Sequence, residues 1–350
     1  MSYLDPRAGQ TPGPTPQPPA WPPPAGSPQR PTESQSWQMA QPPTQPEYPD
    51  EDSPVTELGT DVPTPKGAKG RRRAGRGQNK GKSRAGRNLP AAIGVGLSLG
   101  LLVLASLLIE RRALLVVLVA AAGVGVWEMS KALTGAGAKV PLIPLVAGSA
   151  LMTGLAWYAG PDALLLGLIV TVGAATLWSL ADGVKAIRRD FTATVLTAVY
   201  VPFLLSFAAM LVQPDDGAYR VIGVLVAVVL SDTGGYAAGV FLGRHPMAPK
   251  ISPKKSWEGF AGSMTAAAIG SGALLFFLLD VPVYYGLLFG AVISVVAVLG
   301  DLAESMLKRD LGIKDMSNLL PGHGGLMDRL DSILFAVPTA YLLYSIIMPS

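Results

Sequence analysis

The sequence predicts an all-α, polytopic membrane protein with about nine transmembrane helices and a disordered, Pro-rich and basic N-terminal tail. Hydrophobic residues make up 49% of its 350 residues and charged residues only 15%, against roughly 25% charged residues in a typical soluble domain. Residues 89–350 consist mostly of long Leu, Val, Ala and Gly blocks, whereas residues 1–88 contain 18 of the 31 prolines. The chain therefore divides into a cytoplasmic tail, 1–88, and a transmembrane domain, 89–350.

The tail contains two kinds of sequence. Residues 1–65 are rich in Pro and polar residues and cannot bury enough apolar surface to offset the entropy of ordering, so we expect disorder. Residues 66–87 hold ten basic residues and no acid, and they directly precede an apolar segment. Such a juxtamembrane run is typical of binding to anionic lipid and of a cytoplasmic location. Nucleic acid, the other partner of basic runs, is not expected here.

The number of spans follows from the length of the apolar blocks. The hydrocarbon core of a bilayer is about 30 Å thick, so a spanning helix needs roughly 20 apolar residues. Nine segments meet or approach this length. They are residues 89–109, 113–133, 140–160, 162–182, 192–213, 218–242, 259–279, 281–301 and 331–348.

Basic residues are distributed unequally between the two ends of these segments. With the tail on the cytoplasmic side, 13 Lys and Arg residues of the transmembrane domain lie on that side and three on the other. Because cytoplasmic loops carry an excess of Lys and Arg, this distribution predicts a cytoplasmic N-terminus. The two longest loops, 243–258 and 302–330, are then cytoplasmic and would meet a cytosolic substrate. A bacterial plasma membrane fits this arrangement.

Cysteine is absent and only two histidines occur. Thiolate catalysis, disulfides and zinc or iron–sulfur sites built on Cys are therefore excluded. A metal ion would have to be held by oxygen ligands, which favours Mg²⁺, Mn²⁺ or Ca²⁺.

The C-terminal loop combines acids and bases at helical spacing. Asp301, Ser305 and Lys308 recur every three or four residues, which places them on one face of a helix that leaves the eighth span. Asp328 and Asp331 share a face at the start of the ninth span. Two helix ends can thus gather three carboxylates, an arrangement that is unfavourable without a cation among them. Phosphoryl chemistry uses such a cation to neutralise phosphate oxygens.

A glycine-rich turn, PGHGG at residues 321–325, separates these two helix ends. Its glycines allow backbone N–H groups to approach an anion closely. Four basic residues surround it and could hold phosphate: Lys308, Arg309, Lys314 and Arg329. The alternative is a simple juxtamembrane loop in which the acids pair with the bases.

A second polar stretch begins inside the sixth span. Asp232 lies in an apolar run, where an ionisable residue is a functional candidate by default. The following loop carries Lys254 and Lys255 among Ser, Pro and Trp residues, a composition that suggests a shaped loop able to receive a phosphate or a base. Glu128, in the second span, is expected to be a structural partner rather than a catalytic group.

The run from Ser305 to Asp331, SMLKRDLGIKDMSNLLPGHGGLMDRLD, closely resembles the signature of the phosphatidate cytidylyltransferases, also called CDP-diacylglycerol synthases. That pattern reads S-x-x-K-R-x₄-K-D-x₄-(L/I/F)-(P/G)-x-H-G-G-x-x-D-R-x-D, and the run meets each fixed position. The stretch SDTGGYAAGVFLGRHPMAPKISPKKSWEG, which begins at Ser231, resembles a second segment of the same family. The tail lies outside the resemblance.

The resemblance implies transfer of CMP from CTP to phosphatidate, which yields CDP-diacylglycerol for phospholipid biosynthesis and pyrophosphate. It also implies Mg²⁺, with a second, monovalent cation left open, and a bilayer around the enzyme; a homodimer is left open as well. The implied metal ligands are Asp301, Asp328 and Asp331, and the implied catalytic group adds Lys308, Arg309 and Arg329. The implied substrate-binding residues are Ser231, Asp232, Lys254, Lys255, Ser305, Lys314, Asp315, Gly322, His323, Gly324 and Gly325.

Three other functions are alternatives for a membrane protein of this composition. A CTP-dependent polyprenol or dolichol kinase would transfer a terminal phosphate and release CDP instead of pyrophosphate. A CDP-alcohol phosphotransferase would need a D-G-x₂-A-R-x₈-G-x₃-D-x₃-D pattern, which does not occur. A secondary transporter, with Asp232 and Glu128 as coupling acids, would concentrate polar groups near the bilayer midplane and show repeated halves. The polar groups here crowd one predicted surface instead, which favours an enzyme.

Overall fold

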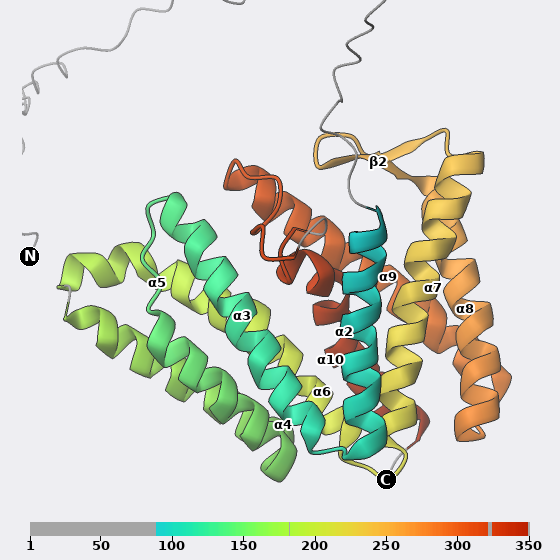
Figure 1. Ribbon diagram of the computed structural model, residues 1–350, viewed down its shortest axis with the longest axis horizontal. Coiled ribbons are helices and arrows are strands. Elements are labelled where there is room, and N and C mark those ends of the chain that lie inside the picture. Colours follow the sequence, from blue (N-terminus) through green and yellow to red (C-terminus); the bar gives the residue numbers. More distant parts are fainter. Residues whose placement is uncertain (1–88, 182, 321–323, 349–350) are drawn as a thin grey trace, which may run out of the picture. The chain divides into compact units, whose positions relative to one another are not determined.

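The structure, a computed structural model, describes residues 89–181, 183–320 and 324–348, and it is almost entirely helical (Figure 1). The predicted tail, Gly322 and His323 lie outside the described residues. The helices are α2 (Leu89–Ile109), α3 (Ala113–Gly135), α4 (Leu142–Leu180), α5 (Val184–Ala198), the π-helix η1 (Val199–Phe203), α6 (Leu204–Val212), α7 (Gly217–Leu242), α8 (Trp257–Leu279), α9 (Val283–Asp310) and α10 (Met327–Ile347). Two strands, β1 (Pro246–Ala248) and β2 (Ser252–Ser256), pair antiparallel as a hairpin between α7 and α8.

The predicted number of nine spans is not confirmed. Seven of the described helices are long and apolar enough to cross a membrane. The α5 helix, η1 and α6 together form one of these, Arg188–Val212, and α2 contributes only a shorter apolar helix, Gly96–Ile109. Two of the nine predicted segments, 140–160 and 162–182, correspond to the two parts of α4, which are joined at Gly160.

The α4 element folds back on itself. Gly160 adopts a left-handed φ of 75°, which glycine tolerates, and Pro161 follows it as the first residue of the second half. A Cβ atom on Gly148 would lie 2.1 Å from the side chain of Thr171, and one on Gly167 would lie 3.1 Å from that of Met152. These contacts show that the two halves run antiparallel, with small residues allowing their close approach.

Helices α7, α8 and α9 pack closely side by side, and α10 packs on α9. Glycines make the α7–α8 contact possible, since a Cβ on Gly234 would lie 2.8 Å from the carbonyl oxygen of Gly262. Against α9, a Cβ on Gly290 would lie 2.1 Å from the carbonyl oxygen of Ala267 in α8. The backbones thus replace side chains at these crossings, and the polar residues of the three helices are brought within reach of one another.

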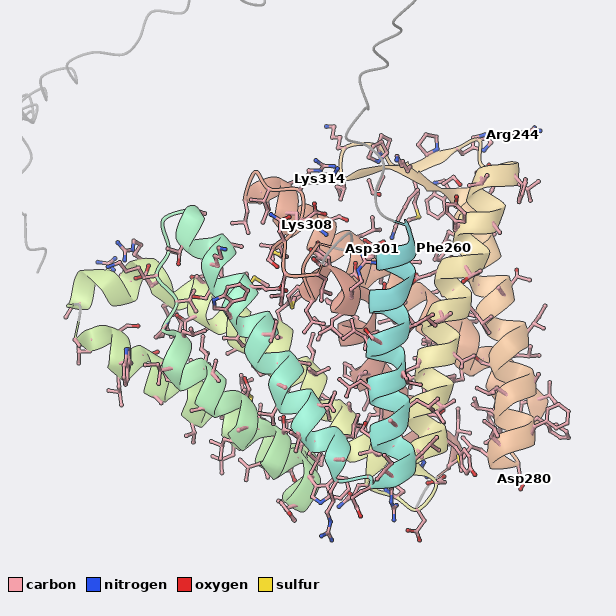
Figure 2. The ribbon with its side chains drawn as sticks, viewed as in Figure 1. Arg244, Phe260, Asp280, Asp301, Lys308 and Lys314 are labelled. Atoms are coloured by element: carbon pink, nitrogen blue, oxygen red, sulfur yellow. The ribbon has the colours of Figure 1, made fainter. Side chains whose placement is uncertain are left out.

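The polar connections separate to two ends of the helical domain. The β-hairpin and the loop between α9 and α10 lie at one end, together with the C-terminus of α3 (Figure 1). Asp280 marks the opposite end, away from Arg244 in the hairpin (Figure 2). The connection between α2 and α3 also lies at that opposite end (Figure 1). Arg111 in this connection pairs with Asp215 at 3.0 Å. The two longest predicted loops, 243–258 and 302–330, therefore lie at the same end of the helices, as predicted. The cytoplasmic orientation of that end stays a prediction.

Candidate active site

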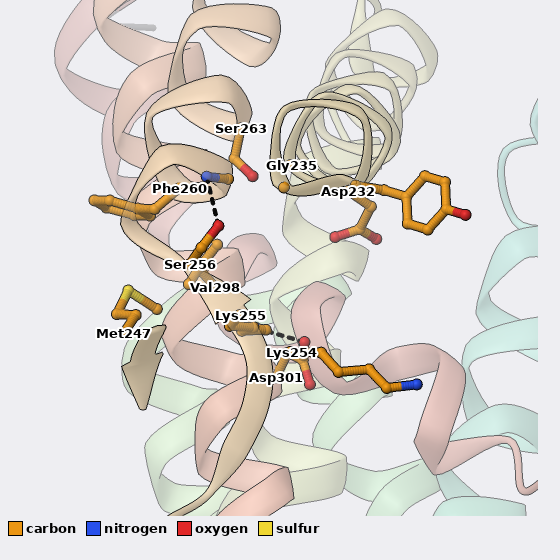
Figure 3. Close-up of a pocket in the computed structure, with 13 residues that line it drawn as sticks. Asp232, Gly235, Met247, Lys254, Lys255, Ser256, Phe260, Ser263, Val298 and Asp301 are labelled. Atoms are coloured by element: carbon orange, nitrogen blue, oxygen red, sulfur yellow. Dashed lines mark hydrogen bonds and ion pairs between the residues drawn. The ribbon is translucent and has the colours of Figure 1, made fainter. Parts of the chain in front are cut away.

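Two neighbouring cavities occupy the end of the helical domain that carries the hairpin. The first, here called the inner pocket, has a volume of about 290 Å³ and lies between α7, α8, α9 and β2 (Figure 3). Its lining residues are Asp232, Gly235, Tyr236, Gly239, Met247, Lys254, Lys255, Ser256, Gly259, Phe260, Ser263, Val298 and Asp301. It therefore joins two carboxylates and two lysines to small and aromatic side chains.

The second cavity, here called the basic pocket, has a volume of about 260 Å³ and lies between the hairpin, the end of α9 and the loop that follows it. Its lining residues are Ile251, Ser252, Pro253, Lys254, Ser305, Lys308, Arg309, Ile313, Lys314 and Asp315. Four cations and one carboxylate line it, so it is a strongly anion-attracting surface. Lys254 belongs to both pockets and marks their junction.

Strand β2 directs its two lysines into different surroundings. Successive side chains of a strand point to opposite faces, and Lys255 forms an ion pair with Asp301 of α9, whereas the Lys254 side chain extends in another direction (Figure 3). Ser256, the N-cap of α8, accepts a hydrogen bond from the Gly259 N–H group at 3.1 Å. The hairpin is thus fastened to α9 by a salt bridge and continues directly into a capped helix.

The predicted polar face of α9 is present. Ser305 Oγ donates to Asp301 Oδ1 at 3.3 Å, and Lys308 Nζ lies 3.2 Å from Oε1 of Glu304, each across one helical turn. Glu304 is fully buried, and neither of its carboxylate oxygens makes a hydrogen bond with the described residues. Helix α9 continues to Asp310, so the first part of the predicted loop 302–330 is helical. Helix α9 also packs against α10.

Asp328, a predicted metal ligand, is held by three donors. Its Oδ1 accepts a hydrogen bond from Lys308 Nζ at 2.8 Å. Its Oδ2 accepts from the backbone N–H groups of Met316 at 3.0 Å and Gly325 at 2.8 Å. Asp328 would have to release Lys308 before Oδ1 could bind an ion.

The three predicted ligands do not gather into one ready metal site. Within the described ranges, no three Asp, Glu or His side chains are grouped closely enough to hold an ion together. Asp331 accepts a hydrogen bond from the Ser332 N–H group at 2.7 Å and lies within electrostatic reach of Asp301 and Asp232. Asp301 and Asp232 both open into the inner pocket. Asp232 and Asp301 are therefore the two carboxylates that could supply oxygen ligands inside this pocket.

Several predicted site residues, both binding and catalytic, lie outside both pockets. Ser231 is buried and hydrogen-bonds to Ser294 of α9 at 2.9 Å, so it joins two helices. Arg329 is exposed on α10, and Gly324 has a left-handed φ of 81° beside Asp315 and Asp328. The described glycines of the turn therefore support carboxylates of this chain.

Glu128 on α3 has hydrogen-bond partners that the sequence did not predict. It is fully buried, and its carboxylate accepts hydrogen bonds from Ser317 and from the backbone N–H groups of Leu326 and Met327 at 2.9 and 2.8 Å. The expectation of a structural partner is therefore confirmed for its hydrogen bonds. Its partners, which lie 189 to 199 positions away, could not be inferred. The signal was a single acid in an apolar span.

Comparison with known proteins shows which family this chain belongs to. The profile of the "Cytidylyltransferase family" matches residues 90–347, nearly all of the described chain. This chain belongs to the cytidylyltransferase family. A protein of Mycobacterium leprae named phosphatidate cytidylyltransferase is 42% identical over 308 residues, which cover 83% of this chain and 99% of the relative.

Two further relatives of the same name show how the similarity is distributed. The Mycobacterium bovis protein is 43% identical over 278 residues, covering 76% of this chain and 91% of the relative. The Bacillus subtilis protein is 39% identical over 155 residues, covering 43% of this chain and 57% of the relative. The predicted family resemblance is therefore confirmed. In this cytidylyltransferase, as in the prediction, the cationic and acidic residues of the two conspicuous segments meet at one end of the helices.

Proposed function

We propose that this chain transfers CMP from CTP to phosphatidate, giving CDP-diacylglycerol and pyrophosphate. The main support is similarity along almost the whole length of a relative named phosphatidate cytidylyltransferase. The structure adds two pockets that meet at one lysine, Lys254. Such a junction suits a reaction that joins the phosphates of two substrates.

The basic pocket is the better place for the triphosphate of CTP. Its cations Lys308, Arg309 and Lys314 face one carboxylate, Asp315, and Arg offers a planar fork that matches phosphate oxygens. The inner pocket is the better place for the phosphate of the lipid. Tyr236, which lines it, is 76% exposed on an apolar helix and so lies where acyl chains would approach.

The chemistry is an attack by a phosphate oxygen of phosphatidate on the α-phosphorus of CTP. A new bond forms between that oxygen and the α-phosphorus, and the bond from the α-phosphorus to the oxygen bridging it to the β-phosphorus breaks. Pyrophosphate leaves with the bonding electron pair. Because the lipid phosphate is already ionised at neutral pH, no strong base is needed, and positioning and charge neutralisation carry the catalysis. Lys254, at the junction of the pockets, is placed to steady the phosphate that is transferred.

Mg²⁺ is part of the proposal. Asp301 fits as a ligand because its side chain is about one-third exposed and opens into the inner pocket, and Asp232 and Asp331 are its acidic neighbours. The ion would neutralise phosphate oxygens there. Carboxylate oxygens are the expected ligands, because the chain has no Cys. Lys255, now paired with Asp301, would then be free to turn toward phosphate.

The product assay separates this proposal from its nearest rival. The detergent-purified full chain is given CTP labelled at the α-phosphate, short-chain phosphatidate and Mg²⁺. We expect label in the lipid phase and pyrophosphate released in equal amount. CDP release that depends on a polyprenol, without labelled lipid, would instead identify a lipid kinase, and no lipid-dependent consumption of CTP would overturn both.

We also propose that the end carrying the two pockets faces the cytoplasm of a bacterial cell. The chain lacks Cys, so single cysteines can be placed at Lys250 in the hairpin and at Asp215 at the opposite end. A membrane-impermeant maleimide added to intact cells should label the Asp215→Cys variant and spare the Lys250→Cys variant until the cells are opened. The reverse pattern would invert the orientation.

A further inference from the structure

A carboxylate from α3 caps the start of α10. The first N–H groups of a helix have no partner within the helix and attract anions. Here the N–H groups of Leu326 and Met327 donate to the two oxygens of Glu128 at 2.9 and 2.8 Å. Glu128 is fully buried, so these charge-assisted bonds are shielded from water.

The same carboxylate also contacts Ser317, in the middle of the loop between α9 and α10. Ser317 Oγ donates to Glu128 Oε1, and the Leu319 N–H group donates to Ser317 Oγ at 3.1 Å. Gly325 lies against the carboxylate so closely that a Cβ atom there would be 2.7 Å from Glu128 Oε1. The carboxylate thus touches both the entry and the exit of residues 317–327.

A second carboxylate, Asp328 on α10, also accepts hydrogen bonds from two separate parts of this loop. Asp328 accepts from Met316 N–H and Gly325 N–H, and its other oxygen accepts from Lys308 of the basic pocket. The position of Lys308 therefore depends on where the first turn of α10 lies. Glu128 fixes that turn but lines neither the inner nor the basic pocket.

We propose that Glu128 is a positioning residue for this enzyme: it anchors the N-terminus of α10 and thereby places Asp328 and Lys308 for catalysis. The proposal rests on the proposed function for its kinetic part only. It predicts that loss of the Glu128 carboxylate lowers kcat and raises the KM for CTP, because Lys308 lines the basic pocket. The KM for phosphatidate should change little, because Glu128, Asp328 and Lys308 do not line the inner pocket. A residue that merely stabilised the fold would reduce the amount of folded enzyme without altering kcat per folded molecule.

The first experiment measures kinetics and amide hydrogen exchange on the full chain bearing Glu128→Gln. The amide keeps the shape of the side chain, but its NH₂ group cannot accept the second N–H of α10. We expect kcat to fall about tenfold or more, the KM for phosphatidate to stay within about twofold, and exchange to accelerate in residues 316–320 and 324–327, since a hydrogen bond to a charged group is lost. Exchange is measured without substrate, so its result stands even if the proposed reaction is wrong.

Two further variants make the outcome decisive. Ser317→Ala removes one donor to the same carboxylate, and its effect on kcat should be less than additive with that of Glu128→Gln. Thr153→Ala is the matched control, because it removes a buried interhelical hydrogen bond, to Ser206, far from the loop. It should leave kcat and exchange of 316–320 and 324–327 unchanged. Wild-type kcat in Glu128→Gln, full additivity with Ser317→Ala, or acceleration spread evenly over all helices would overturn the proposal.

Discussion

The Lys308 ammonium group lies 2.8 Å from Oδ1 of Asp328, which joins the end of α9 to the start of α10 across 20 residues of sequence. The same nitrogen is 3.2 Å from Oε1 of Glu304. Both acids are almost fully buried. One lysine that lines the basic pocket therefore contacts two buried acids, one on each helix.

Replacing Lys308 should damage stability as well as activity. In Lys308→Met, Glu304 and Asp328 lose their shared cation, and removing one partner of a buried ion pair costs about 3 kcal/mol or more. We expect a lower melting temperature in detergent and the loss of nearly all turnover. Arg309→Met, a change at the neighbouring but exposed cation, should leave the melting temperature within a few degrees of wild type. Equal melting temperatures for both variants would show that the ion pairs contribute nothing to stability.

Asp301 should be needed for turnover but not for folding. Asp301→Asn removes the negative charge that now pairs with Lys255 and that we propose for Mg²⁺, so we expect kcat to fall at least about 100-fold. Because the side chain is only partly buried, membrane insertion and gel-filtration behaviour in detergent should be unchanged. Asp310→Asn, an exposed acid on the same helix outside both pockets, serves as the control and should remain fully active. Retained activity in Asp301→Asn would remove this residue from the proposed metal site.

Lys314 should act on the binding of CTP. It is exposed and lines only the basic pocket of the two, so Lys314→Ala should raise the KM for CTP about tenfold, the loss expected for one charge-assisted contact, with a smaller effect on kcat. Lys250→Ala removes an exposed cation of the hairpin that lines neither pocket and should change neither constant. Steady-state kinetics, with each substrate varied in turn while the other is saturating, distinguish the two. A raised KM for phosphatidate instead of CTP would reverse the assignment of the pockets.

Divalent ions should be required, and the requirement should depend on the inner pocket. Removing Mg²⁺ with a chelator should abolish turnover, and returning Mg²⁺ should restore it. In Asp232→Asn, which alters one carboxylate of the inner pocket, the Mg²⁺ concentration for half-maximal rate should rise several-fold. An unchanged Mg²⁺ dependence in this variant would exclude Asp232 from the ion's surroundings.

The close α7–α8 contact should tolerate no added methyl group. In Gly234→Ala, the new Cβ would lie 2.8 Å from the Gly262 carbonyl oxygen, a backbone atom that cannot rotate away, so we expect a loss of about 1–3 kcal/mol of stability. Gly173→Ala in α4 is the matched control, because a Cβ there meets nothing within 4 Å. Its melting temperature should equal or exceed that of wild type, since Ala is the better helix former. A melting temperature of Gly234→Ala as high as that of Gly173→Ala would show that the close approach of α7 and α8 does not limit stability.

Much of the chemistry could be predicted because it depends on local spacing. Asp301, Ser305 and Lys308 lie on one helical face as their intervals require, and Lys254 and Lys255 lie beside them in the two pockets. The break at Gly160 was also predicted, because the segments 140–160 and 162–182 meet there, and the structure shows two antiparallel halves. The total of nine spans is not confirmed, since seven of the described helices are long and apolar enough to cross a membrane.

The sequence by itself determined the helical membrane architecture, the segregation of charge to one end and the family, because each follows from residue order over tens of residues. Only the tertiary structure decided which groups are already engaged. It assigned Asp328 to Lys308 and two backbone N–H groups, and it brought Glu128 to the start of α10. The physical reason is that a buried carboxylate must find donors wherever packing places them. Partners almost 200 residues apart leave no periodic trace in the sequence.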